Sequence, residues 1–176
     1  MSVSLDEKIL PLKALLMDVD GVLTDGRVII DSNGVESKQF DVRDGHGLKM
    51  LQRSGLTLGL LTGRRSPVVT RRAAELGIRI VFQRCHDKLL AYEQIKQQHK
   101  FADHEIAYIG DDVIDLPVLR RVGFAATVAD ADSELAAHVD WRSSKSGGCG
   151  AVRELCQLIM QTQGTWDAAL SRYLRD

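Results

Sequence analysis

The chain has 176 residues, of which 44% are apolar and 27% charged, with a formal net charge of −1 at pH 7. This length suits one domain, expected to span 1–176, and the near-neutral charge excludes the global basic field of a nucleic-acid-binding protein. No apolar run approaches the roughly 20 residues of a membrane span, and the first residues lack a signal-peptide pattern. The cysteines Cys85, Cys149 and Cys156 lack zinc-type spacing, which favours reduced thiols in a cytoplasmic protein. The charge and the apolar pattern predict neither a nucleic-acid nor a membrane partner.

Apolar strand-like runs alternate with amphipathic helical stretches along the chain. Strands are predicted at 13–19, 57–63, 78–83, 105–110 and 124–129. Helices are predicted at 45–55, 66–77, 87–100, 115–123, 132–139 and 150–163, with a further turn or two in 165–174. This alternation predicts an α/β fold with a doubly wound, mainly parallel, Rossmann-like sheet, whose ligand lies beyond the carboxyl ends of the strands.

The segment 26–42 differs from the rest. Two alternating segments flank Asn33-Gly34, a strong short hairpin signal because both positions of the turn favour positive φ. A β-hairpin is therefore expected directly after the first strand. At the other end of the chain, 150–176 is expected to form a C-terminal helix and tail.

Polar side chains stand where the buried strands end, and the topology would bring them together. They are Asp18 and Asp20 after the first strand, Thr62, Gly63 and Arg64 after the second, Lys88 at the start of a helix, and Asp111, Asp112 and Asp115 after the strand 105–110. An isolated pair of aspartates could be only a turn former or a helix cap. Together, these residues predict a catalytic site.

Crowded carboxylates need a cation, and oxygen ligands suit Mg²⁺. Asp18 and Asp111 could share the metal, and Asp18 is then also a possible nucleophile, because carboxylates form acyl-phosphate intermediates. Asp20 is near enough to protonate a leaving oxygen and later activate water. Thr62 with the N–H of Gly63 could hold phosphoryl oxygens, and Lys88 could neutralise the nucleophile and the phosphate.

The segments "DVDGVLT", "LLTGR", "DK" and "GDDVID", in that order, resemble the motifs of the haloacid dehalogenase superfamily of phosphohydrolases. The resemblance implies Asp18 as nucleophile and Asp20 as general acid/base, with Thr62 and Lys88 as phosphate contacts. It implies Mg²⁺ bound by Asp18, the Asp20 carbonyl and Asp111, and it makes Asp112 and Asp115 outer-sphere or orienting groups.

Members of this superfamily usually carry a cap domain, but one hairpin and one helix already fill the interval between Asp20 and Thr62. The chain resembles the capless family of 3-deoxy-D-manno-octulosonate 8-phosphate phosphatases in "DGVLTDG", "QFDVRDGHGLKML", "GDDVIDLPVLRRVG" and "SGGCGAVRELC". That family implies a homotetramer in which hairpins pack together and a neighbouring subunit closes each active site. It also places Arg43, Gly45 and His46, on the returning loop, near the substrate.

The expected function is therefore a Mg²⁺-dependent phosphatase in lipopolysaccharide sugar synthesis, acting through an aspartyl-phosphate on a small phosphorylated sugar acid, the octulosonate 8-phosphate. Arg64 is the candidate for binding the carboxylate of that sugar acid, although it could be an ordinary helix-approach charge. His46 could equally be a surface histidine, and "GGCG" (147–150) could be either a flexible entry to the last helix or a substrate lid.

Other functions stay open at this point. A nonulosonate 9-phosphate, such as an N-acylneuraminate 9-phosphate, offers the same terminal phosphate and distant carboxylate. A phosphoglycolate-type phosphatase would usually carry a cap, and a receiver module would place its acceptor aspartate on a later strand. A non-catalytic regulator of a cytidylyltransferase would have no need of the motif residues that this chain retains.

Overall fold

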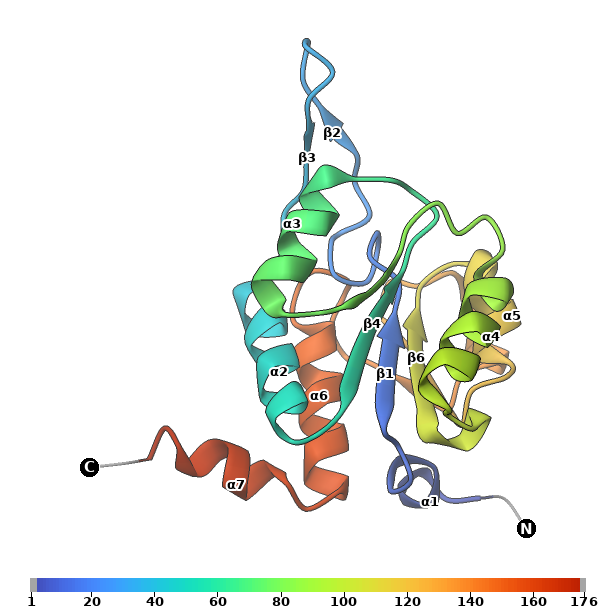
Figure 1. The fold of residues 1–176 in the computed structure, drawn as a ribbon, viewed down its shortest axis with the longest axis vertical. Helices are drawn as coiled ribbons and strands as arrows, with labels where there is room; N and C mark the ends of the chain where they lie inside the picture. Colours follow the sequence, from blue (N-terminus) through green and yellow to red (C-terminus); the bar gives the residue numbers. More distant parts are fainter. Residues whose placement is uncertain (1–2, 175–176) are drawn as a thin grey trace.

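The computed structural model describes residues 3–174 and is built on a six-stranded parallel sheet with the strand order β5-β4-β1-β6-β7-β8 (Figure 1). The strands are β1 (Ala14–Met17), β4 (Thr57–Leu61), β5 (Ile80–Phe82), β6 (Ile106–Gly110), β7 (Phe124–Thr127) and β8 (Trp141–Arg142). Every residue of β1 is buried, as expected for a central strand covered on both faces. The predicted fold class is confirmed.

Helices cover both faces of the sheet (Figure 1). They are α1 (Leu5–Ile9), α2 (Val42–Arg53), α3 (Pro67–Leu76), α4 (Lys88–His99), α5 (Leu116–Leu119), α6 (Ala151–Thr162) and α7 (Trp166–Ser171), with short 3-10 helices at Asp103–Glu105, Val113–Asp115 and Ser133–Ala137. Leu15 and Met17 pack into the core beneath α2, α3 and α6, whereas Ala14 and Leu16 pack into the core beneath α4 and α5. Within 3–174, no helix is long and apolar enough to cross a membrane.

Local capping explains where the helices begin and end. Helix α3 matches its prediction, because the Ser66 hydroxyl accepts the N–H of Val69 at 3.3 Å, Pro67 opens the first turn and Gly77 ends the helix at φ 74°.

The three cysteines are free thiols, and the cytoplasmic location stays a prediction.

Helix α2 begins earlier than the predicted 45–55. The Asp41 carboxylate accepts the N–H groups of Arg43 and Asp44 at 2.6 and 3.3 Å and so starts the helix at Val42. Arg43, Gly45 and His46 therefore lie on a helix, and the expectation of a loop there was wrong. The predicted helix at 132–139 is only the 3-10 turn at Ser133–Ala137.

The hairpin consists of β2 (Ile29–Ile30) and β3 (Glu36–Ser37), which are antiparallel and project from the carboxyl end of the sheet (Figure 1). The hairpin prediction is confirmed, but its turn is longer than the expected Asn33-Gly34 pair. The Asp31 carboxylate accepts the N–H groups of Asn33 and Val35 at 2.9 and 2.8 Å, and only Gly34, at φ 78°, takes positive φ in the turn. Hydrogen bonds to the Asp31 carboxylate thus stabilise a turn that contains one residue with positive φ instead of two.

Candidate active site

A cleft of about 230 Å³ opens at the carboxyl end of the sheet. Because β1 lies between β4 and β6, the residues that follow these three strands meet there. The lining residues are Asp18, Asp20, Gly26, Thr62, Gly63, Arg64, Asp111, Asp112 and Ile114. The structure thus brings together most of the residues that the sequence singled out at the strand ends.

Lys88 forms the base of the site. Its Nζ lies 2.7 Å from Asp18 Oδ2 and 2.6 Å from Asp115 Oδ1, and its side chain is only 2% exposed. Asp87 holds the lysine in place by capping α4, since its carboxylate accepts the N–H of Leu90 at 3.1 Å. One ammonium group thus bridges two buried carboxylates, and removing it would leave both carboxylates without a cation.

Burial and like charge raise the pKa values of the two strand-end aspartates. Desolvation, with the charge of Asp115 next in importance, raises the pKa of Asp18 to about 7. Desolvation, together with the charges of Asp18 and Asp115, raises the pKa of Asp111 to about 7. Burial alone would lower the pKa of Lys88, but the two carboxylates outweigh it and raise that pKa. The site carries more negative charge than Lys88 balances.

The oxygens of this cluster fit a hard divalent cation. One carboxylate oxygen each of Asp18, Asp111 and Asp115 lies within 4.8 Å of the others. Asp111 Oδ1 is buried and, among the described residues, has no hydrogen-bond partner. Such an oxygen costs free energy unless a cation or donor meets it.

Asp115 serves a different purpose from the other two aspartates. Its Oδ1 accepts from Lys88 and from the Tyr108 hydroxyl at 2.5 Å, and its Oδ2 accepts the N–H groups of Asp111 and Asp112 at 3.0 and 3.3 Å. Because both oxygens are already engaged, Asp115 fits the orienting role expected of it. The Asp112 carboxylate accepts the N–H of Val113 at 2.7 Å and caps the 3-10 turn.

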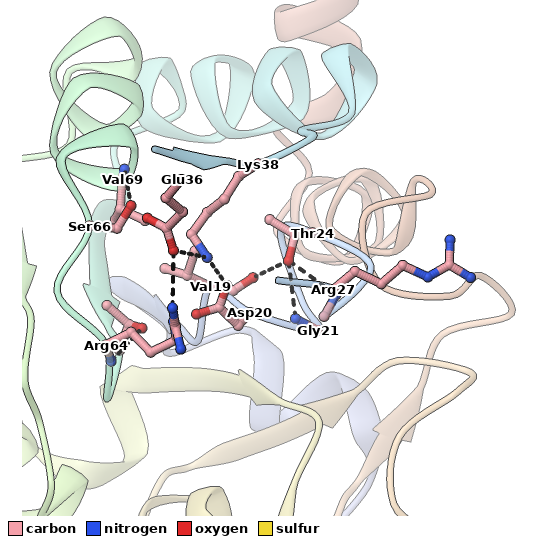
Figure 2. Close-up of polar contacts among 12 residues, drawn as sticks. Val19, Asp20, Gly21, Thr24, Arg27, Glu36, Lys38, Arg64, Ser66 and Val69 are labelled. Atoms are coloured by element: carbon pink, nitrogen blue, oxygen red, sulfur yellow. Dashed lines mark hydrogen bonds and ion pairs between the residues drawn. The ribbon is translucent and has the colours of Figure 1, made fainter. Parts of the chain in front are cut away.

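Gly21 lets the first-motif loop pass close to Asp111. Its φ is 87°, and a Cβ at this position would stand 1.9 Å from Asp111 Oδ2. The Thr24 hydroxyl holds the loop by accepting the N–H groups of Gly21 and Gly26 at 3.3 and 3.2 Å (Figure 2). Any side chain at position 21 would displace the carboxylate that faces the cation site.

Asp20 is held from the hairpin side. Its carboxylate pairs with the Lys38 ammonium, and Lys38 also lies 3.4 Å from Glu36, which in turn lies 3.3 Å from Arg64 (Figure 2). Burial would raise the pKa of Glu36, but the Ser66 hydroxyl, Lys38 and Arg64 outweigh it and lower that pKa. Lys38 and Glu36 were not singled out from the sequence, because their role depends on the direction in which the hairpin leaves the sheet.

Thr62, Gly63 and Arg64 lie along the β4 side of the cleft. Thr62 is 1% exposed, and its hydroxyl accepts the N–H of Arg64 at 3.4 Å. Gly63 has open space above it, since a Cβ there would meet only the Cys85 carbonyl at 3.8 Å. The Arg64 side chain is 48% exposed and lies 3.3 Å from the Glu36 carboxylate.

Arg43, Gly45 and His46 do not line this cleft. Arg43 pairs with Asp41 at 2.8 Å, and Gly45 packs against the side chain of Arg72. His46 Nε2 lies 2.7 Å from the Tyr173 hydroxyl, so the histidine contacts the C-terminal segment. Their expected substrate contacts stay predictions.

The segment 147–150 packs against the first-motif loop. The N–H of Gly148 donates to the Val22 carbonyl at 2.9 Å, and a Cβ on Gly147 would stand 1.7 Å from the Gly21 carbonyl oxygen. The buried carboxylate of Asp44 accepts the N–H groups of Gly150 and Arg153 at 3.3 and 2.7 Å, which joins the start of α2 to the start of α6. Gly147 and Gly148 are needed because a side chain at either position would collide with the backbone of the first-motif loop.

An aspartate at the end of the central parallel strand, paired with a buried lysine beside a second acidic strand end, is the arrangement of a phosphohydrolase of the haloacid dehalogenase superfamily. No protein-family model matches the chain. The 3-deoxy-D-manno-octulosonate 8-phosphate phosphatase KdsC of Escherichia coli K12 is 40% identical over 158 residues, which cover 90% of this chain and 84% of the relative. The chain belongs to the 3-deoxy-D-manno-octulosonate 8-phosphate phosphatase family.

Solved structures agree with this assignment. A probable YrbI family phosphatase from Pseudomonas syringae pv. phaseolica is 42% identical with a TM-score of 0.95, covering 97% of both chains. The 3-deoxy-D-manno-octulosonate 8-phosphate phosphatase of Moraxella catarrhalis, solved with magnesium, phosphate and 3-deoxy-D-manno-octulosonate, is 42% identical with a TM-score of 0.93, covering 96% of this chain and 97% of that one. The deoxy-D-mannose-octulosonate 8-phosphate phosphatase (YrbI) of Haemophilus influenzae was solved with cobalt, at 41% identity and a TM-score of 0.88 over 92% of this chain and 94% of that one.

Proposed function

We propose that this protein is a Mg²⁺-dependent phosphatase that hydrolyses 3-deoxy-D-manno-octulosonate 8-phosphate to the free sugar acid and phosphate, a step of lipopolysaccharide sugar synthesis. The observation that carries the proposal is the buried Asp18–Lys88 pair beside Asp111 Oδ1, which has no hydrogen-bond partner within residues 3–174. It stands in a chain 40% identical to curated phosphatases of that name. The Moraxella catarrhalis relative with magnesium, phosphate and the sugar acid supports the choice of metal and substrate.

Asp18, the carbonyl of Asp20 and Asp111 are the groups that would hold Mg²⁺. The metal supplies charge neutralisation at the phosphoryl group and at the clustered carboxylates. The negative charge of the buried aspartates, which Lys88 alone does not balance, fits this role.

Asp18 is the nucleophile in this proposal. One oxygen of Asp18 attacks phosphorus and the bond between phosphorus and the sugar oxygen breaks, while Asp20 gives its proton to the leaving oxygen. Asp20 then takes a proton from water, whose oxygen attacks phosphorus and breaks the bond to Asp18. Lys88, 2.7 Å from Asp18, keeps the carboxylate oriented and offsets the phosphate charge.

Thr62 and Gly63 supply phosphate donors on the β4 side of the cleft, through a hydroxyl and a backbone N–H. Arg64, half-exposed at the mouth, binds the carboxylate of the sugar acid. A guanidinium group suits a carboxylate because it offers two parallel donors. The ion pair with Glu36 holds Arg64 over the opening until the substrate arrives.

The proposal includes a homotetramer in which a neighbouring subunit closes the site, and in which Arg43, Gly45 and His46 reach the substrate. The projecting hairpin supports it, because its apolar side chains Val28, Ile29, Ile30 and Val35 are 44% to 59% exposed. A two-stranded hairpin with an exposed apolar surface needs a partner to be stable. Sedimentation should give a tetramer for the wild type and smaller species for Ile30→Asp.

Phosphate release from a matched panel tests the substrate. The panel holds the octulosonate 8-phosphate, a nonulosonate 9-phosphate, arabinose 5-phosphate and phosphoglycolate, each with and without Mg²⁺. The highest kcat/KM is expected for the octulosonate 8-phosphate with Mg²⁺. A preference for the nonulosonate would move the enzyme to sialic-acid-type sugars, and release from none of the four would favour a regulatory role.

A further inference from the structure

The hairpin region brings one buried lysine against Asp20, a residue that lines the catalytic cleft. Lys38 follows β3 directly, and its side chain is only 1% exposed although it carries a charge. Its ammonium pairs with Asp20 and lies 3.4 Å from Glu36 (Figure 2). Burying a lysine is costly unless anionic partners surround it, so Lys38 is stable here only with these carboxylates in place.

Glu36 is itself fixed from the sheet side. Arg64, on the segment after β4, lies 3.3 Å from the Glu36 carboxylate. The chain of contacts therefore runs from Arg64 through Glu36 and Lys38 to Asp20, and joins the β4 edge of the cleft to the β1 loop. Lys38 is the one member of this chain that touches Asp20.

The two aspartates of the first motif have separate lysine partners. Asp18, which is 4% exposed, pairs with Lys88 at 2.7 Å. Asp20 pairs with Lys38, and among residues 3–174 Lys38 is the only side chain that the structure places in an ion pair or hydrogen bond with the Asp20 carboxylate. Without Lys38, the carboxylate would be free to adopt other rotamers.

We propose that Lys38 is a positioning residue for the reaction, which holds the Asp20 carboxylate at the place where it exchanges a proton with the leaving oxygen and with water. The inference rests on the proposed function and adds to it a residue outside the four motifs. General acid–base catalysis requires the carboxylate to be within hydrogen-bond reach of the oxygen it serves, and small displacements cost rate. Lys38 thus acts on turnover through Asp20.

A double-mutant cycle tests this role. Lys38→Met, Asp20→Asn and the double variant are compared for kcat and KM on the octulosonate 8-phosphate with saturating Mg²⁺. General acid–base catalysis contributes about 10²- to 10⁴-fold, so Lys38→Met should lower kcat by about 10- to 100-fold and change KM by less than about twofold. In the Asp20→Asn background the same change should alter kcat by less than about twofold, because residues that act as a unit are not additive.

Arg27→Met is the matched control. Arg27 also belongs to the hairpin region, but its side chain is 82% exposed, pairs with Asp25 and points away from Asp20 (Figure 2). It should keep wild-type kcat and KM. If Lys38→Met lowers kcat by the same factor with and without Asp20, or raises KM at unchanged kcat, the positioning role is wrong.

Two further measurements distinguish failure of the positioning role from misfolding of the variant and from failure of the proposed substrate. If Lys38→Met does not fold or assemble like the wild type in circular dichroism and sedimentation, Glu36→Gln replaces it, with a smaller loss of kcat that also vanishes beside Asp20→Asn. An additive loss for Glu36→Gln would overturn the proposal. If the wild type and Arg27→Met do not hydrolyse the octulosonate 8-phosphate, the proposed substrate fails, and the same cycle is read with p-nitrophenyl phosphate.

Discussion

Replacing Lys88 with Met removes the only cation that the described structure places between Asp18 and Asp115. Lys88 lies 2.7 Å from one carboxylate and 2.6 Å from the other, with 2% of its side chain exposed. Methionine keeps much of the apolar stem but leaves buried carboxylates facing each other. The change therefore tests electrostatics with little change in packing.

Breaking a buried ion pair by removing one partner costs about 3–5 kcal/mol. Burial already raises the pKa of Asp18 to about 7, so protonation relieves part of the repulsion at neutral pH. We therefore expect a loss near the lower limit, about 3 kcal/mol at pH 7, which corresponds to a fall in Tm of roughly 6–12 °C for a domain of this size.

The sign of the pH dependence follows from the same pKa. In the variant, the folded-state pKa of Asp18 lies still further above its unfolded value, so the folded state binds protons more tightly and loses stability as pH rises. The deficit of Lys88→Met should thus be larger at pH 8.5 than at pH 5.5. Saturating Mg²⁺ should reduce it, because the cation replaces part of the missing charge.

The assay is urea unfolding followed by circular dichroism, with EDTA and with Mg²⁺, and Lys96→Met is the matched control. Lys96 lies on the same helix α4 between two carboxylates, 2.6 Å from Asp103 and 3.3 Å from Glu93, but far more exposed to solvent. Its loss should cost less than about 1 kcal/mol. Equal losses for the two lysines, or a Lys88→Met deficit independent of pH and Mg²⁺, would refute the reasoning.

Three further predictions concern the metal site, the helix junction and the substrate. Gly21→Ala should weaken Mg²⁺ binding in calorimetry by about 10-fold or more, because its Cβ would stand 1.9 Å from Asp111 Oδ2. Gly34→Ala, at φ 78° with nothing within 4 Å, should cost only the left-handed strain of about 1–2 kcal/mol and leave Mg²⁺ affinity unchanged. Burial raises the folded-state pKa of Asp44 to about 6, so its charge destabilises the wild-type fold as pH rises from 4 to 7. The free energy of unfolding of Asp44→Asn, minus that of the wild type, should therefore increase over this range by at most roughly 3 kcal/mol. A difference that stays constant with pH would contradict this. Arg64→Met should raise KM for the octulosonate 8-phosphate about 10-fold or more but leave KM for p-nitrophenyl phosphate, which has no carboxylate, within about twofold; equal effects on both would exclude the carboxylate role.

The elements that local sequence determines were predictable. The strand β1 was predicted because burial on both faces requires a continuous run of apolar residues. The helix α3 was predicted because its capping residues Ser66, Pro67 and Gly77 mark its two ends in the sequence. Asp18 and Lys88 could also be expected to meet, since the strand topology decides which strand ends are neighbours.

The remaining features depend on tertiary contacts. The Lys38–Asp20 pair exists because the chain that returns from the hairpin passes beside the first-motif loop, which alternation along the strand does not reveal. The start of α2 is set by the Asp41 carboxylate, which caps the helix at Val42. The close approach of Gly147 to Gly21 joins parts of the chain that are distant in sequence. Helix α1, with five residues, was too short to show a helical period.

The most direct test of the account is phosphate release from 3-deoxy-D-manno-octulosonate 8-phosphate by the wild type and by Asp18→Asn, each with Mg²⁺ and with EDTA. Rapid release is expected only for the wild type with Mg²⁺, and Asp18→Asn should show no measurable turnover although it remains folded in circular dichroism. Substantial release by Asp18→Asn, or equal release with EDTA, would contradict a metal-dependent reaction through Asp18.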